Sequence, residues 1–189
     1  MQNVHTHRPL PVAGFAHPTR NVAAFGIQHG YKIADFGAGS GAYTIALSER
    51  LENSGTVYAI DVQRDLLRRL HSEAQRRGLK NVEIIWADLE VPRASKLADA
   101  SIDLVLVSNL LFQVPDKLLV MREARRVVRP SGRVVLIDWS ESFGNLGPIK
   151  EDVVTKETAL ELAEKAGLVL EKEFSPGAHH YGLMLKPAL

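Results

Sequence analysis

From residue 31 onward the sequence alternates between short apolar runs and longer amphipathic ones, and this alternation limits the folds open to the chain. The short runs, such as residues 56–60 (TVYAI), are rich in the β-branched and aromatic residues that strands prefer. The longer runs carry leucines at helical spacing, as Leu66, Leu67 and Leu70 do within residues 63–77. Strands that alternate with helices indicate βαβ units with right-handed crossovers and a parallel sheet.

Seven strands and four helices follow from this pattern. The strands are expected at residues 31–36, 56–60, 82–86, 102–107, 133–137, 168–174 and 180–185. The helices are expected at residues 41–52, 63–77, 117–128 and 156–166, and residues 130–132 (PSG) should turn the chain before the fifth strand. Because the last two strands are joined by only a few residues, 175–177 (SPG), they must be antiparallel neighbours. The predicted fold class is α/β: a doubly wound, Rossmann-like sheet of seven mostly parallel strands, with a C-terminal antiparallel hairpin and helices on both faces.

Length and composition favour one globular domain. The chain has 189 residues, of which 46% are hydrophobic and 24% charged, enough to build a sizeable core. We expect residues 1–20 to form an N-terminal arm that could cover the active site, and residues 21–189 to form the domain itself. The net charge is +1, and acidic residues are mixed into the basic clusters at 64–77 and 122–133. There is therefore no strong nucleic-acid signal.

The residue types that are missing exclude several kinds of site. With no cysteine, the chain has no disulfide, no thiolate metal site and no cysteine nucleophile. No apolar stretch approaches the length needed to cross a bilayer, and no signal peptide is apparent. We therefore expect a cytoplasmic protein with no membrane partner. His5 and His7 could ligate a metal, but two histidines without a third ligand are a weak signal, and no metal is expected.

A glycine-rich loop joins the first strand to the first long helix. It reads Asp35-Phe36-Gly37-Ala38-Gly39-Ser40-Gly41. Doubly wound folds bind nucleotides at such a strand-to-helix turn, where glycines let the backbone approach a ligand and the helix presents unpaired N–H groups. The alternative is a tight turn that binds nothing, although three alternating glycines exceed what a turn needs.

Acidic residues follow each of the next two strands. Asp61 closes the second strand, twenty residues beyond Gly41, where such folds place an acid that accepts hydrogen bonds from ribose hydroxyls. Asp88 follows the third strand. Each could instead cap the structure after its strand. Together with Asp35, however, they would lie at the C-terminal ends of three neighbouring parallel strands and face one crevice.

With these motifs the sequence resembles the class I S-adenosylmethionine-dependent methyltransferases, from about residue 22 to residue 187. The resemblance implies that the loop of Asp35, Phe36, Gly37, Ala38, Gly39 and Gly41 wraps the methionine part of S-adenosylmethionine. It implies that Asp61, beside Val62, binds the ribose, and that Asp88 contacts the adenine amino group between Ala87 and Leu89. Residues 103–112 (DLVLVSNLLF) resemble the family's fourth motif, so Ser108, Asn109 and Leu110 should border the amino-acid end of the cofactor. Residues 127–133 resemble the family's L-K-P-G-G turn.

A nicotinamide cofactor is the main alternative. Gly37-x-Gly39-x-x-Ala42 also fits the NAD fingerprint, and Asp61 lies at the distance that fingerprint requires. Three features count against an NAD-dependent oxidoreductase. About thirty residues precede the first strand, an acid follows the third strand, and the sheet closes with a hairpin. A non-catalytic protein that binds the cofactor, or that depends on a partner, is the other alternative.

The methyl acceptor is less constrained by the sequence. Methyl transfer needs orientation of the two reactants, and a base only if the acceptor must lose a proton. Candidate pocket residues are Phe15, Gln113, Trp139 and Phe143, and candidate bases are His17 and His179. The D/N/S-P-P-Y/F motif of nucleic-acid amino methyltransferases is absent after strand four, so we expect a small-molecule substrate. Residues 109–113 depart from the aromatic-histidine ending common in quinone-type relatives, which leaves the acceptor open. The protein is expected to be a monomer or homodimer, with S-adenosylhomocysteine as the product of the cofactor.

Overall fold

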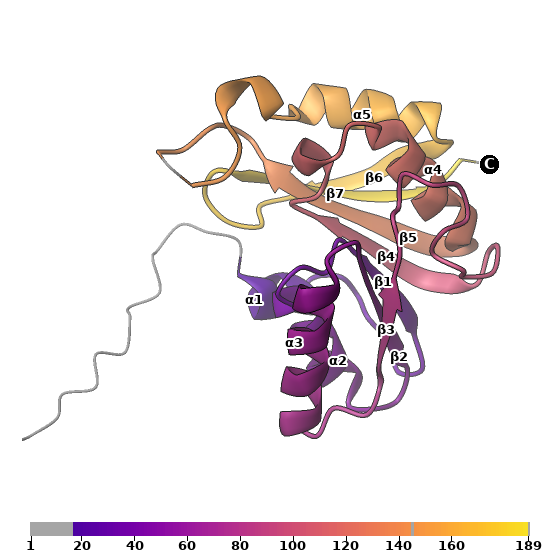
Figure 1. Cartoon of the computed structure of the whole chain (residues 1–189). Helices are drawn as coiled ribbons and strands as arrows, with labels where there is room; N and C mark the ends of the chain where they lie inside the picture. The colour runs from indigo at the N-terminus through magenta and orange to yellow at the C-terminus, as the bar shows by residue number, and fades with distance from the viewer. Residues whose placement is uncertain (1–16, 145, 189) are drawn as a thin grey trace, which may run out of the picture.

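The structure is a computed structural model that describes residues 17–144 and 146–188. At the centre of this described part is a seven-stranded sheet with the strand order β3-β2-β1-β4-β5-β7-β6 (Figure 1). The strands are β1 (Lys32–Phe36), β2 (Thr56–Asp61), β3 (Val82–Trp86), β4 (Ile102–Ser108), β5 (Val128–Trp139), β6 (Leu168–Phe174) and β7 (His180–Pro187). Strands β1 to β5 pair in parallel, whereas β7 is antiparallel to both β5 and β6. The predicted doubly wound sheet with its antiparallel hairpin is confirmed.

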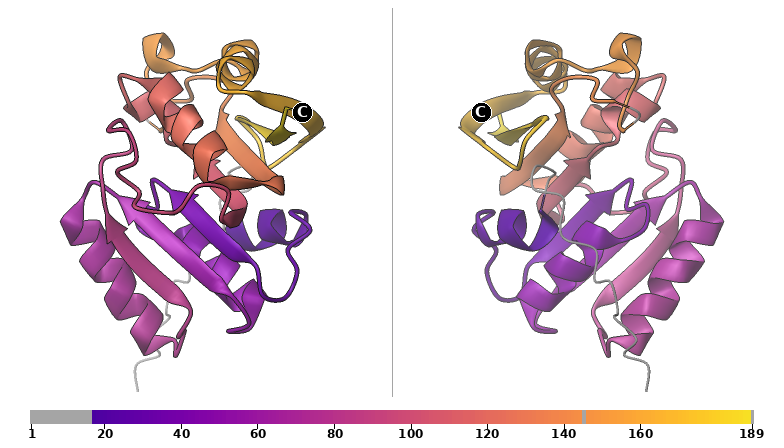
Figure 2. Two further views of the ribbon diagram at one scale, coloured as in Figure 1. Left: turned by 90° about the vertical axis from the view of Figure 1, so that its right-hand side faces the viewer. Right: turned by 90° about the vertical axis from the view of Figure 1, so that its left-hand side faces the viewer.

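Helices cover both faces of this sheet (Figure 2). The helices are α1 (Pro18–Ala23), α2 (Ala42–Leu51), α3 (Arg64–Arg76), α4 (Lys117–Val127) and α5 (Lys156–Lys165), and two 3-10 turns are η1 (Leu111–Gln113) and η2 (Lys150–Asp152). Helices α1 and α2 pack over one apolar cluster, which includes Phe25 and Leu47. Helices α4 and α5 pack over a second cluster on the opposite face, which includes Met121 and Ala159. The sheet is therefore buried on both sides, as its nearly continuous apolar strands require.

Strand β5 begins earlier than the sequence predicts, and the expected turn at residues 130–132 is wrong. The strand spans Val128–Trp139, with Val128 opposite Ile102 of β4. The register then shifts, so that Arg133 lies opposite Leu104. This irregularity accommodates a proline inside a strand, because proline cannot donate to the ladder. Gly132 is required there, since a Cβ atom would lie 2.8 Å from the carbonyl oxygen of Asp103.

The N-terminal helix crosses the boundary that the sequence suggests between arm and domain. Helix α1 includes residues on both sides of the expected division at residues 20 and 21. Asn21, on α1, is buried and donates hydrogen bonds to the Tyr43 hydroxyl at 2.9 Å and the Pro176 carbonyl at 3.0 Å. This residue thus joins α1 to α2 and to the turn between β6 and β7. Phe15, His5 and His7 lie outside the described residues.

The loops that follow the parallel strands lie together at one edge of the sheet. Because β1 to β5 are parallel, the segments after all five strands emerge at the same edge. Strand β6 runs in the same direction as β5, since both are antiparallel to β7, so residues 175–179 also lie there. In open α/β sheets this edge is where ligands bind. Within the described residues, no helix is long and apolar enough to span a membrane.

Candidate active site

The glycine loop after β1 is held against the neighbouring strand by backbone hydrogen bonds. The N–H groups of Gly37 and Ala38 both donate to the carbonyl of Ile60, at 2.9 and 3.0 Å. Gly39 has φ of +53°, and Gly41, the N-cap of α2, has φ of +85°, a region that favours glycine. A Cβ on Gly41 would lie 2.1 Å from the Leu70 side chain, whereas a Cβ on Gly39 would meet only the Gly37 carbonyl at 3.9 Å. Gly41 is therefore needed for packing, and Gly39 borders open space.

The carboxylate of Asp35, at the end of β1, is buried and binds the first turn of α2. Its side chain is buried and accepts a hydrogen bond from the Thr44 hydroxyl at 2.6 Å and another from the Thr44 backbone. Burial raises the pKa of Asp35 to about 6, although the bonds to Thr44 act in the opposite direction. Asp35 thus satisfies one N–H group in the first turn of α2, a group that would otherwise be available to a ligand.

Asp61 connects the end of β2 to the glycine loop. Its carboxylate is only 6% exposed, with Oδ2 accepting from Gly39 N at 2.8 Å and Oδ1 from Gln63 N at 2.8 Å. The N-cap of α3 is Gln63, so Asp61 does not cap that helix in the usual sense. A carboxylate has about four lone-pair positions. Each oxygen of Asp61 therefore keeps one position for a further donor, such as a ribose hydroxyl.

A cavity of about 380 Å³ opens between the glycine loop and the segments after β2, β3 and β4. Asp88, whose Oδ1 accepts from Glu90 N at 2.9 Å, contributes a second carboxylate to its wall. The predicted residues that line the cavity are Gly37, Gly39, Asp61, Val62, Ala87, Asp88, Leu89, Leu110 and Gln113. The remaining lining residues, which the sequence interpretation missed, are Gln63, Leu66, Glu90 and Val114. The spacing of Leu66 predicts only an apolar position of the helix over residues 63–77, and the path of α3 brings this side chain to the cavity.

Other predicted residues support this cavity without lining it. Phe36 and Ala38 are buried, and Gly41 is the N-cap of α2. Ser108 ends β4 and interacts with Tyr43, while Asn109 follows it with φ of +52°. The Asn109 Oδ1 atom is buried and has no hydrogen-bond partner among the residues described. Buried polar atoms are normally hydrogen-bonded. The unpaired Oδ1 of Asn109, next to Leu110 in the chain, can therefore accept a hydrogen bond from a bound ligand.

The lining of the cavity is suited to a nucleoside. Carboxylates of Asp61 and Asp88 stand among the apolar side chains of Val62, Leu66 and Leu89, which can hold a base and its ribose. The volume lies within the range of small-molecule sites. Among the described residues no cluster of three or more potential metal ligands occurs.

Aromatic residues gather farther along the same edge, after β5 and before β7. Trp139 is 7% exposed and its ring lies 4.3 Å from that of His180. Phe143 stacks on His179, with ring centroids 3.8 Å apart, and His179 Nδ1 lies 2.6 Å from Glu141 Oε1. The other candidate base, His17, is exposed and precedes α1. The structure thus brings Trp139, Phe143 and His179 into one region.

Asp138 links this aromatic region to the loop after β4, which borders the cavity beside the glycine loop. Its side chain is fully buried, with Oδ1 accepting from Trp139 N at 2.8 Å and Oδ2 from Leu111 N at 3.1 Å. Desolvation raises the pKa of Asp138 to about 7. From the sequence, Asp138 is expected only as the first residue of the segment 138–143 that could contact the acceptor, because a single acid at a strand end does not reveal that it will bind the loop after β4.

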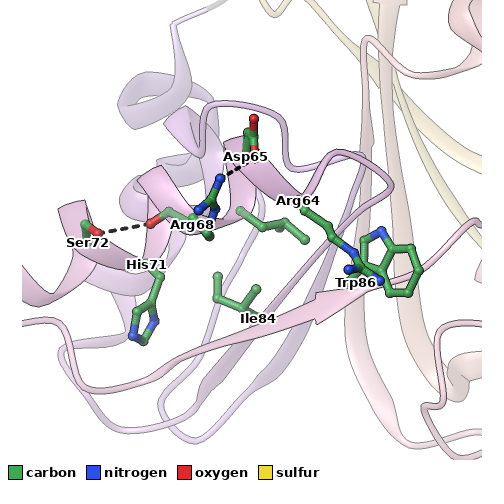
Figure 3. A pocket seen from close by; sticks show the side chains of 8 residues that line it. Arg64, Asp65, Arg68, His71, Ser72, Ile84 and Trp86 are labelled. Carbon is green, nitrogen blue, oxygen red and sulfur yellow. Dashed lines mark hydrogen bonds and ion pairs between the residues drawn. The ribbon is translucent and has the colours of Figure 1, made fainter.

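A larger hollow of about 910 Å³ lies outside α3 and β3 (Figure 3). Arg64 lies over the ring of Trp86, 3.6 Å from its centroid, and Trp86 Nε1 donates to the Val62 carbonyl at 2.9 Å. Trp86 remains 52% exposed. The lining of this hollow shares no residue with the cavity beside the glycine loop, so it is a separate surface feature.

Comparison with known proteins identifies the family. A family model described as a methyltransferase domain matches residues 27–181. The demethylmenaquinone methyltransferase of Geobacillus sp. (strain WCH70) is 34% identical over 116 residues, which are 61% of this chain and 48% of that protein. The enzyme of the same name from Bacillus velezensis is 34% identical over 121 residues, covering 62% and 50% of the two chains. The chain thus spans about half the length of the curated relatives it matches.

A solved structure agrees over nearly the whole chain. The crystal structure of a SAM dependent methyltransferase from Aquifex aeolicus superposes with a TM-score of 0.81 at 27% identity, covering 90% of this chain and 89% of that one. The chain therefore belongs to the methyltransferase domain family, as a class I, S-adenosylmethionine-dependent member.

Proposed function

We propose that this chain transfers the methyl group of S-adenosylmethionine to a small hydroxylated aromatic molecule of the quinone type. The observation that carries the proposal is the position of the cavity of about 380 Å³ beside the glycine loop, which we assign to the cofactor and call the cofactor cavity. It is lined by Gly39, Asp61 and Asp88, and Asp138 joins the loop bordering it to an aromatic region. The names of the relatives from Geobacillus sp. and Bacillus velezensis support a quinone-type acceptor.

Each cofactor residue has a proposed task. The loop around Gly37 and Gly39 surrounds the methionine part, supported by Asp35, Phe36, Ala38 and Gly41. Asp61 accepts from the ribose hydroxyls, and Asp88 from the adenine amino group, with Val62, Ala87 and Leu89 against the base. Ser108, Asn109 and Leu110 border the charged end. When bound, the cofactor supplies an activated methyl group on a sulfonium.

The acceptor side is proposed to lie between Gln113, Trp139 and Phe143. Residues 1–20, Phe15 among them, are proposed to cover this side, and residues 21–189 to form the cofactor-binding domain. A planar aromatic ring can stack on the exposed part of Phe143, while Trp139 forms a more deeply buried wall. We propose a cytoplasmic monomer or homodimer acting on free small molecules.

Two measurements test this function. Calorimetric titration with S-adenosylmethionine, S-adenosylhomocysteine and NAD should give micromolar binding of both sulfur compounds and none of NAD. Incubation with S-adenosylmethionine and 1,4-dihydroxynaphthalene, kept reduced by dithiothreitol, should then release S-adenosylhomocysteine and yield a methylated naphthol. Binding of NAD alone would support the oxidoreductase alternative. Cofactor binding without turnover of dihydroxynaphthalene, a catechol or a flavonoid would reject the quinone-type acceptor and favour a partner-dependent protein.

A further inference from the structure

Two walls of the cofactor cavity come from segments that lie far apart in the sequence. One wall is the turn after β3, and the other is the segment between β4 and α4. The lining residues of the first wall are Asp88, Leu89 and Glu90, and those of the second are Leu110, Gln113 and Val114. Because the two walls follow different strands, an interaction between them fixes how far apart they stand.

The turn after β3 is held in place by its own backbone and by one buried side chain. Asp88 Oδ1 accepts from Glu90 N at 2.9 Å, and the Asp88 carbonyl accepts from Val91 N at 3.1 Å. Leu89 is buried in the apolar cluster that α4 and α5 cover. Glu90, between these contacts, is only partly buried. We therefore expect the turn to keep its fold when the side chain of Glu90 is changed.

The carboxylate of Glu90 binds the segment that forms the opposite wall. Its Oε1 accepts from the backbone N–H of Asp116 at 2.6 Å, two residues beyond Val114. Asp116 is the N-cap of α4, and its own Oδ1 accepts from Leu119 N at 3.1 Å. A hydrogen bond to a carboxylate is among the stronger kinds, and negative charge is favoured at a helix N-terminus. The bond therefore links the two walls directly.

A helix can supply the acceptor for its N-cap N–H from within its own first turn. In a capping box this acceptor is a Glu or Gln at the third position of the helix. In α4 that position is Leu119, whose side chain accepts no hydrogen bond. The acceptor is instead Glu90, 26 residues earlier in the chain and on the other wall of the cavity. A bond that could have been local thus joins two segments that border the cofactor.

We propose that Glu90 is a positioning residue for the cofactor, because its bond to Asp116 N holds the two walls at the separation that S-adenosylmethionine requires. The inference rests on the cofactor assignment in the proposed function and not on the identity of the acceptor. When the bond is lost, only a fraction of the molecules keeps both walls in place. The apparent affinity for the cofactor falls by that fraction.

Two pairs of variants test this inference by removing the bond from either side. Glu90→Ala removes the acceptor, whereas Glu90→Gln keeps a carbonyl oxygen in its place. Asp116→Pro removes the N–H donor, whereas Asp116→Ala keeps it. Both Asp116 variants lose the side-chain bond to Leu119 N, so Asp116→Ala controls for a weakened start of α4. Differential scanning fluorimetry establishes which variants are folded at the temperature of the binding assay.

Calorimetric titration with S-adenosylhomocysteine measures the effect on binding. Glu90→Ala should bind about three- to thirtyfold more weakly than the wild type, and Asp116→Pro more weakly than Asp116→Ala by a similar factor. Glu90→Gln should stay within about threefold of the wild type. Combining Glu90→Ala with Asp116→Pro should not add the two losses, because both remove the same bond. A weakened Glu90→Ala beside an Asp116→Pro that binds as well as Asp116→Ala would overturn the inference, since Glu90 would then act on the cofactor itself.

Amide hydrogen exchange without any ligand provides an independent measurement. The Asp116 N–H should exchange more slowly in the wild type than in Glu90→Ala, and equal rates would overturn the inference even if Asp116→Pro failed to fold. Unchanged affinity in Glu90→Ala would also overturn it. Absence of S-adenosylhomocysteine binding in the wild type would instead reject the cofactor assignment, and hydrogen exchange would still show whether Glu90 and Asp116 are linked.

Discussion

Asp61 Oδ2 accepts a hydrogen bond from the backbone N–H of Gly39 at 2.8 Å, so the acid that ends β2 holds the loop that follows β1. The same carboxylate also lines the cavity beside the glycine loop and keeps lone pairs for a further donor. Loop shape and cofactor affinity are therefore expected to depend on one side chain.

Replacing Asp61 should weaken cofactor binding strongly. Asp61→Ala removes hydrogen bonds to a charged group, worth roughly 1.5–3 kcal/mol, or about ten- to 150-fold in affinity for S-adenosylhomocysteine. Asp65→Ala is the control, because Asp65 is exposed on α3 and pairs only with Arg68 among the contacts described. Calorimetry measures both variants. Equal affinity in Asp61→Ala and the wild type would contradict the site assignment.

The two glycines Gly39 and Gly41 should respond differently to the same added methyl group. Both have positive φ, so Gly39→Ala and Gly41→Ala incur similar backbone strain. Only Gly41→Ala forces Leu70 to move, an overpacking that costs about 1–3 kcal/mol and lowers Tm by roughly 2–12 °C more. Gly39→Ala should instead reduce cofactor affinity, since Gly39 lines the cavity. Differential scanning fluorimetry and calorimetry separate the two effects, and an equal loss of Tm would contradict this reading.

Asp138 should make the free energy of unfolding fall as pH rises toward neutrality. Burial raises its pKa from 3.8 to about 7, so the folded state binds the proton more tightly than the unfolded state does. Between these values the slope reaches at most about 1.4 kcal/mol per pH unit. Asp35, with a pKa of about 6, contributes in the same direction at lower pH.

Asp138→Asn isolates this contribution. Urea denaturation from pH 4.5 to 7.5 should show that the wild type loses stability relative to the variant, and the contribution of Asp35 cancels because both proteins contain it. Asparagine keeps the shape of the side chain but cannot titrate. A stability difference between the two proteins that does not change with pH would mean that Asp138 has an ordinary pKa.

Asn21 should stabilise the contact between α1 and the rest of the molecule. Asn21→Ala removes two buried hydrogen bonds, which contribute about 0.5–1.5 kcal/mol each. A double-mutant cycle with Tyr43→Phe should give a coupling of about 0.5–1.5 kcal/mol from urea denaturation. Thr19→Ala, at an exposed position of the same helix, is the control. A coupling near zero would show that the bond to Tyr43 adds nothing to stability.

The sequence by itself determined the fold class and which loop and acids lie around one cavity. Apolar periodicity reports which face of each segment is buried, and parallel strands bring their C-terminal ends to one edge. From these two facts alone, the loop at Gly37 and Gly39 and the acids Asp61 and Asp88 could be placed together. All four line one cavity in the structure.

Only the tertiary structure decided which side chains meet across large separations in the chain. The bonds of Asn21 to Pro176, Asp138 to Leu111 and His179 to Glu141 join residues on different elements. Each depends on the register of β5 and β7 and on local twist. The bulge that carries Pro130 within β5 also belongs here, because it arises from pairing with β4 rather than from local preference. A periodic pattern fixes the faces of an element, but not the distances between polar groups at its ends, and those distances determine which side chains can act together.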